Sequence, residues 1–86
     1  MTEEEKKDLS RYFVLAMYRD EGSILLDEYE ELNDILKRNS MAQELDDALY
    51  KYYMKKITYE EYRMVHDKYV SLLYGEEVNK LSLKKD

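Results

Sequence analysis

The chain has 86 residues and a net charge of −6, with 44% hydrophobic and 40% charged residues. This length is typical of one domain, and the apolar content excludes a disordered chain. The longest apolar run, Tyr12 to Tyr18, is far shorter than the ~20 residues of a membrane span, and the lack of cysteine excludes disulfides and thiolate metal sites.

Helix signals along the chain predict an all-α fold, a compact bundle of helices over residues 3–21, 24–39, 41–56 and 59–74. Each predicted start follows a residue that can cap a helix, in chain order Thr2, Ser23, Ser40 and Thr58. Three of these residues have Glu or Gln at the third position after them, which is the spacing of a capping box. Gly22 and Gly75 are the expected stops of the first and fourth helices. The short connections favour antiparallel neighbours, and no strand is predicted.

Residues 1–75 are expected to form the single domain, and residues 76–86 a charged tail in which Val78, Leu81 and Leu83 dock loosely. The first seven residues lack the basic start and the apolar stretch of a secretory signal. We therefore expect a soluble, cytoplasmic protein without a membrane segment.

Tyrosine is the most unusual component, with ten residues beside a single phenylalanine. Its ring packs like an apolar group while its hydroxyl needs a partner, so it suits binding surfaces. Helical spacing assigns four tyrosines to the core, namely Tyr29, Tyr52, Tyr62 and Tyr69. It leaves Tyr12 undecided and five tyrosines as candidates for outside contacts: Tyr18, Tyr50, Tyr53, Tyr59 and Tyr74.

Groups that could perform chemistry are scarce. His66 is the only histidine, and its place at the edge of an apolar stripe favours a packed, hydrogen-bonded role. The segment from Asp20 to Glu31 has the length of a calcium loop, but Gly22, Ile24 and Leu25 stand where that loop needs two oxygen ligands and a glycine. The two glycines are too far apart for a phosphate-binding loop. The sequence thus predicts a non-enzymatic protein with no cofactor and no metal.

Acidic residues are concentrated between residues 20 and 50, where ten acids face two bases. Helical spacing gathers several of them into an outward acidic ribbon, which consists of Asp27, Glu30, Glu31, Asp34, Glu44, Asp46 and Asp47. Neighbouring carboxylates on a helix are ~5 to 6 Å apart, close to the phosphate spacing of a nucleic-acid strand. One hypothesis is an inhibitor or regulator, such as a phage or mobile-element product that mimics DNA and blocks a nucleic-acid-handling enzyme. The other interpretation is a solvated helix face.

Two further surfaces predict protein partners. Tyr50, Tyr53 and Met54 point away from the inner side of the third helix and form an aromatic patch, unless another part of the chain covers them. Between Tyr12 and Tyr18 the first helix is apolar on all sides, so Val14, Leu15 and Tyr18 are expected to mediate self-association into a homodimer. The alternative is that this helix is the centre of the bundle.

Two other functions remain open. A DNA- or RNA-binding regulator would use the bases that alternate with aromatics before and within the fourth helix, which are Lys51, Lys55, Lys56 and Arg63. Two of these lysines also lie where a helix end favours cations. A structural or assembly subunit is the third possibility.

Overall fold

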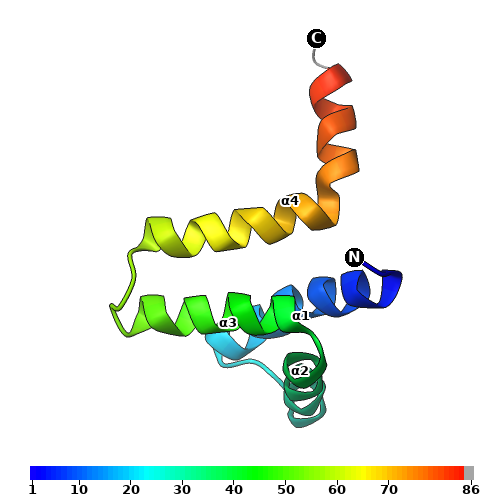
Figure 1. Ribbon diagram of the computed structural model, residues 1–86. Coiled ribbons are helices and arrows are strands. Elements are labelled where there is room, and N and C mark those ends of the chain that lie inside the picture. The colour runs from blue at the N-terminus through cyan, green and yellow to red at the C-terminus, as the bar shows by residue number, and fades with distance from the viewer. Residues whose placement is uncertain (85–86) are drawn as a thin grey trace. The chain divides into compact units, whose positions relative to one another are not determined.

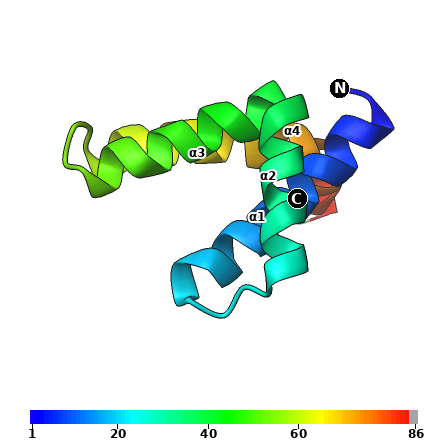
Figure 2. The ribbon, with the colours of Figure 1, turned by 90° about the horizontal axis from the view of Figure 1, so that it is seen from below.

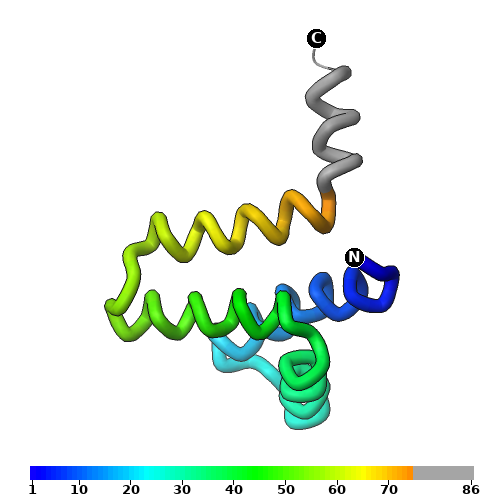
Figure 3. Tube along the Cα trace, in the orientation of Figure 1, coloured from blue at the N-terminus to red at the C-terminus, as the bar shows by residue number. Residues whose placement is uncertain are grey.

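The computed structural model describes the backbone of residues 1–84 and the side chains of residues 1–74, the part drawn in colour in Figure 3. Its elements are α1 (Glu3–Glu21), α2 (Leu26–Arg38), α3 (Ser40–Tyr53) and α4 (Tyr59–Lys84) (Figure 1). Residues 1–84 contain no strand, so the predicted all-α fold of four helices is confirmed. The chain divides into an N-terminal unit, Met1–Asp46, and a C-terminal unit, Asp47–Asp86. A single domain over residues 1–75 with a separate tail stays a prediction.

Both ends of α1 follow from the local sequence. The Thr2 hydroxyl accepts the Glu5 N–H at 3.1 Å, and the Glu5 carboxylate accepts the Thr2 N–H at 2.9 Å, which completes the predicted capping box. At the other end Gly22 has φ of 75°, and the N–H of Ser23 reaches back to the Tyr18 carbonyl at 2.9 Å. This is the left-handed Schellman ending, which satisfies carbonyls that the helix leaves open.

The start of α2 differs from the prediction. Ser23 belongs to the ending of α1, so it does not cap the next helix, which begins at Leu26 after Leu25 in the extended conformation. The Leu25 N–H donates to the Glu28 carboxylate at 3.0 Å, so an acidic side chain supports this start. As a consequence Leu25 and Leu26 are exposed, although the helical pattern of the sequence places Leu25 on the inner face.

A single residue, Asn39, joins α2 to α3 and replaces Ser40 as the cap. Its side-chain oxygen accepts the N–H groups of Met41 at 3.0 Å and Ala42 at 3.1 Å. Its own N–H completes the last turn of α2 by donating to Ile35 at 2.9 Å, and its amide nitrogen donates to the Glu5 carbonyl at 3.2 Å. Asn39 is buried with all of these groups paired, which explains why the chain turns here in one residue.

The core of the N-terminal unit lies between α1 and α2 and continues onto the first turns of α3. Figures 1 and 2 show α2 crossing α1, the two helices that pack together in this unit. Buried apolar side chains come from all three elements: Leu9, Tyr12, Leu15 and Ala16 of α1, Leu32 and Ile35 of α2, and Ala42 and Leu45 of α3. Within each helix most of these positions recur at three- and four-residue intervals, the period of a helix face.

In the C-terminal unit, α3 ends at Tyr53 and not at residue 56. Lys55 adopts φ of 61°, and Lys56 donates its N–H to the Lys51 carbonyl at 2.8 Å. This is again a Schellman ending, here with lysine in the left-handed position that glycine usually takes. That conformation costs about 1 to 2 kcal/mol for a residue with a Cβ.

We therefore expect Lys55→Gly to raise the free energy of unfolding by about 0.5 to 1 kcal/mol, after subtracting the larger entropy that glycine has in the unfolded chain. Urea denaturation followed by circular dichroism measures this change. Gly22→Ala is the matched control, because a Cβ at Gly22 meets no atom within 4 Å and the cost is only conformational. It should destabilise by about 1 kcal/mol. A destabilised Lys55→Gly protein would contradict this description of the helix end.

The start of α4 agrees with its sequence signals. The Thr58 hydroxyl accepts the Glu61 N–H at 3.1 Å, and the Glu61 carboxylate accepts the Thr58 N–H at 3.1 Å. The predicted end is wrong, because α4 continues through Gly75 to Lys84. Glycine permits a helix to end but does not force it, since inside a helix it costs only about 1 kcal/mol relative to alanine. The predicted docking of the tail side chains lies outside the described residues.

Candidate functional site

Four large side chains are exposed together around the turn between α3 and α4. Three of them form the aromatic patch predicted from the sequence, and Tyr59 at the start of α4 joins them. Their exposed fractions lie between 47% and 64%. We name this set the aromatic tip: Tyr50, Tyr53, Met54 and Tyr59. Exposed apolar side chains are ordinary when they are scattered, but a cluster indicates a binding surface.

A half-buried tyrosine, Tyr52, packs against side chains of the tip. The ring of Tyr52 lies 5.8 Å from that of Tyr53, 5.6 Å from that of Tyr59 and 5.9 Å from that of Tyr62, centroid to centroid. The last of these pairs is stacked, with 16° between the ring planes. Within the tip, Tyr50 and Tyr53 meet edge to face at 6.5 Å. Such ring pairs restrict the side chains, so less entropy remains to be lost when a partner binds.

Lysines are the only charged residues within the tip segment. Between Tyr50 and Tyr59 the chain has three lysines and no carboxylate. Lys51 pairs with Asp47 at 2.9 Å, one helical turn earlier. Lys55 and Lys56 are exposed, and in the described part of the chain no ion pair includes either of them. The tip therefore combines an apolar, aromatic surface with two ammonium groups that form no ion pair with any carboxylate among residues 1–74.

Of the four bases proposed for nucleic-acid binding, two form ion pairs with a carboxylate of their own helix. Arg63 pairs with Asp67 at 3.4 Å, and Lys51 is held by Asp47, so each of these charges is partly neutralised on its own helix. His66 lies beside the carboxylate of Asp67, with 3.3 Å between its Nδ1 atom and the nearest oxygen. Its ring is half-buried, at the edge of the apolar stripe as the sequence pattern predicted.

The acidic ribbon is divided by the structure. Five of its seven members are exposed, namely Asp27, Glu30, Asp34, Glu44 and Asp47. Glu31 is half-buried and holds α2 against α1, because Arg11 donates to its two oxygens at 2.7 and 3.2 Å. These hydrogen bonds lower the pKa of Glu31 below its ordinary value of 4.5.

Asp46 lies in the interior and is separate from the exposed carboxylates. It is 8% exposed, and its Oδ1 atom accepts the Tyr12 hydroxyl at 2.9 Å. Arg19 donates to both carboxylate oxygens, at 2.8 and 3.3 Å. Every buried polar side-chain atom among the described residues has a hydrogen-bond partner. Asp46 therefore fastens the start of α3 to α1, a role that helical spacing alone did not reveal.

The residues expected to mediate self-association are placed differently from the prediction. Leu15 is fully buried in the core of the N-terminal unit, so the expectation that it faces outward is wrong. The reason is that α1 contributes side chains to the core on more than one side, including Tyr12, which reaches Asp46. Val14 and Tyr18 are half-buried beside it. The alternative interpretation, a central first helix, describes this unit better.

An exposed apolar group at the start of α2 was not predicted. Leu25, Leu26 and Tyr29 are 63%, 77% and 44% exposed, although helical spacing assigns Leu25 and Tyr29 to the inner face. Leu25 precedes the helix in the extended conformation, so helical spacing does not apply to it. A sequence signal for Leu26 is the pair Leu32 and Ile35, which are both buried and fix the inward direction of the helix. Counting back from them places Leu26 on the solvent side.

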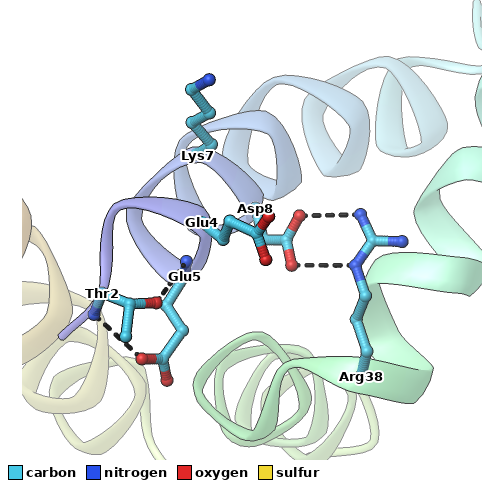
Figure 4. Close-up of a pocket in the computed structure, with 6 residues that line it drawn as sticks. All are labelled: Thr2, Glu4, Glu5, Lys7, Asp8 and Arg38. Atoms are coloured by element: carbon cyan, nitrogen blue, oxygen red, sulfur yellow. Dashed lines mark hydrogen bonds and ion pairs between the residues drawn. The ribbon is translucent and has the colours of Figure 1, made fainter.

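A pocket opens between the N-terminus of α1 and the C-terminus of α2 (Figure 4). Its lining is polar and consists of Thr2, Glu4, Glu5, Lys7, Asp8 and Arg38. Arg38 donates to the two oxygens of Asp8 at 2.7 and 2.9 Å, and this lowers the pKa of Asp8 below its ordinary value of 3.8. Figure 4 shows this ion pair beside the capping box of α1. Both interactions serve the helices themselves, so the pocket needs no ligand to explain it.

Two general features of the described residues bear on function. No group of three or more His, Cys, Asp or Glu side chains in that part of the chain is arranged to hold a metal ion. Of its helices, none combines the length and the apolar character needed to cross a bilayer.

Comparison with protein-family models, with curated proteins and with solved structures found no match to this chain.

Proposed function

We propose that the protein is a non-enzymatic interaction module that binds the surface of a protein through the aromatic tip. The observation that carries this proposal is the joint exposure of Tyr50, Tyr53, Met54 and Tyr59 around one turn. Tyrosine provides a large contact area at low entropic cost, and methionine adapts to the shape of a partner. In this proposal the tip supplies the apolar centre of an interface, and the flanking lysines belong to its polar rim.

The acidic ribbon is a weaker basis for function. Nucleic-acid mimicry needs a continuous row of available carboxylates, but Glu31 is engaged by Arg11, and Asp46 is buried with Arg19. The remaining acids favour solubility, and they also make the N-terminal unit a poor ligand for nucleic acid. In this proposal the aromatic tip is therefore the main binding surface, and nucleic-acid mimicry by the acidic ribbon is secondary.

To test the tip, the double variant Tyr53→Ser/Met54→Ser is compared with the natural chain as bait in extracts of the source cell. We expect the natural chain to retain a specific protein, identified by mass spectrometry, and the variant to lose most of it. Both side chains are exposed, but Tyr53→Ser also removes the ring contacts with Tyr50 and Tyr52, so the free energy of unfolding should fall by about 1 to 2 kcal/mol.

The matched control is Met64→Ser/Tyr74→Ser, which makes the same chemical changes at exposed positions outside the tip. This control should retain the partner. Equal retention by all three proteins would refute the tip as the binding surface. If the natural chain instead binds mixed-sequence single-stranded DNA or RNA, and binding weakens steeply with salt, the nucleic-acid alternative replaces the proposal.

A further inference from the structure

Each copy of this chain has a second exposed apolar surface, and its charge is opposite to that of the tip. Leu25, Leu26 and Tyr29 are exposed at the start of α2. Three carboxylates are exposed on the same helix, at intervals of three and four residues that place them along one side. We name the six residues together the α2 face: Leu25, Leu26, Asp27, Tyr29, Glu30 and Asp34. Its carboxylates border its apolar side chains, just as lysines border the apolar side chains of the tip.

The charge difference between the two surfaces extends to the segments that carry them. Residues 1–46 hold 13 acidic and 6 basic residues, a net charge of −7. The tip segment between Tyr50 and Tyr59 holds only basic residues among its charged ones. Complementary potentials of this kind guide association and fix the orientation of two surfaces. Lys55 and Lys56 have no carboxylate partner in the described part of the chain, whereas the α2 face offers several exposed carboxylates.

We infer that the aromatic tip of one copy docks on the α2 face of a second copy. The inference rests on the proposed function in one respect, that the tip binds protein, and it names the partner as this chain itself. In this contact the two exposed lysines of the tip meet Glu30 and Asp34, while its tyrosines and Met54 cover Leu26 and Tyr29. The sequence predicted self-association through α1, where Leu15 is buried, whereas this inference uses two surfaces that are both exposed.

The contact joins two different surfaces, so its symmetry decides the assembly. Each copy presents both surfaces, and two copies that make the contact twice about a two-fold axis close as a dimer, whereas contacts made once continue into a longer assembly. Salt should weaken either form, since the charged groups lie at the rim of each surface. Association that rises with concentration and falls with ionic strength is the expected behaviour of the natural chain in sedimentation velocity.

The decisive experiment exchanges the charges of the two surfaces. One variant carries Lys55→Glu and Lys56→Glu, and the other carries Glu30→Lys and Asp34→Lys. Each variant alone places like charges opposite one another, so its self-association should weaken at least about tenfold. In an equimolar mixture, the reversed tip of the first variant meets the reversed α2 face of the second. This pairing restores opposite charges across the contact, so a mixed assembly should form.

A matched control changes lysines outside both surfaces. Lys7→Glu/Lys68→Glu alters the net charge by the same amount as the tip variant, and both of these lysines are exposed. This control should associate like the natural chain. A control that weakens as much as the tip variant would show that net charge, and not the docking of these two surfaces, governs association.

Other outcomes would also overturn the inference: a natural chain that stays monomeric at all concentrations, charge-reversed variants that associate normally, or a mixture that does not associate. The proposed function fails separately, in the retention experiment with Tyr53→Ser/Met54→Ser. A monomeric natural chain whose tip still retains a different protein from cell extract would refute self-docking and leave the tip as a protein-binding surface.

Discussion

Replacing Asp46 by alanine is expected to lower the free energy of unfolding by about 2 to 4 kcal/mol. The substitution removes both hydrogen bonds that Asp46 accepts from Arg19, whose side chain is only 15% exposed. Asp20 remains near this guanidinium at 3.4 Å, but it cannot replace the paired carboxylate. The Tyr12 hydroxyl, on a residue that is 3% exposed, also loses its acceptor at 2.9 Å. Buried polar groups that lose such bonds must rearrange or admit water, and both are costly.

The neighbouring residue provides the control. Asp47 is exposed and pairs with Lys51 one turn along α3, so Asp47→Ala should cost only about 0.3 to 0.5 kcal/mol. Urea denaturation of both variants, monitored by circular dichroism, compares the two adjacent aspartates directly. A chain of this length has a total stability of about 4 to 13 kcal/mol, so the Asp46→Ala protein should be partly unfolded at 37 °C if the natural value is low. Equal effects at the two positions would contradict the buried network.

Leu15→Ala is expected to be the second strongly destabilising change, with a loss of about 2 to 5 kcal/mol. Leu15 is fully buried, so the truncation removes apolar contacts and leaves a cavity between α1 and its neighbours in the N-terminal unit. Met17→Ala on the same helix is the control, because Met17 is 49% exposed and should change stability by less than about 0.5 kcal/mol.

This second prediction also distinguishes two roles for α1. A leucine in a self-association surface would, when truncated, change the oligomeric state and leave the stability of the isolated chain nearly unchanged. A leucine in the core of the unit lowers the midpoint of denaturation at every protein concentration. Sedimentation velocity and denaturation of the same variant separate these results, and a concentration-dependent loss restricted to the oligomer would return Leu15 to an interface.

The interactions that hold the N-terminal unit together differ from those at the tip. Ion pairs connect its helices, among them Arg11 with Glu31 and Glu28, Arg19 with Asp46 and Arg38 with Asp8. In the C-terminal unit the exposed tyrosines lie around a turn whose left-handed residue is Lys55, a conformation that glycine would adopt more easily. Lysine at this position costs stability and keeps a positive charge at the tip. We expect lysine to occur at this position because of its positive charge, since the left-handed backbone conformation would favour glycine.

Much of the local structure follows from the sequence alone. The helix boundaries at Thr2, Gly22 and Thr58 depend on hydrogen bonds between residues three to five positions apart, so their signals are complete within a short segment. The exposure of the aromatic patch on α3 was also correctly predicted, because the direction of an amphipathic helix follows from its own pattern. At the start of α3 both Asn39 and Ser40 could cap the helix, and the sequence pattern predicted Ser40 although Asn39 is the cap.

Only the tertiary structure shows which polar and apolar side chains are buried in contacts between helices. Asp46 and Asp47 are adjacent and chemically identical, yet one is buried against Tyr12 and Arg19 while the other is exposed. A helix pattern gives the direction of each side chain around its own axis, but the partner it meets comes from a segment 20 to 34 residues away. Whether a side chain is buried depends on its contact with that distant segment, and only the packing of the helices determines this contact.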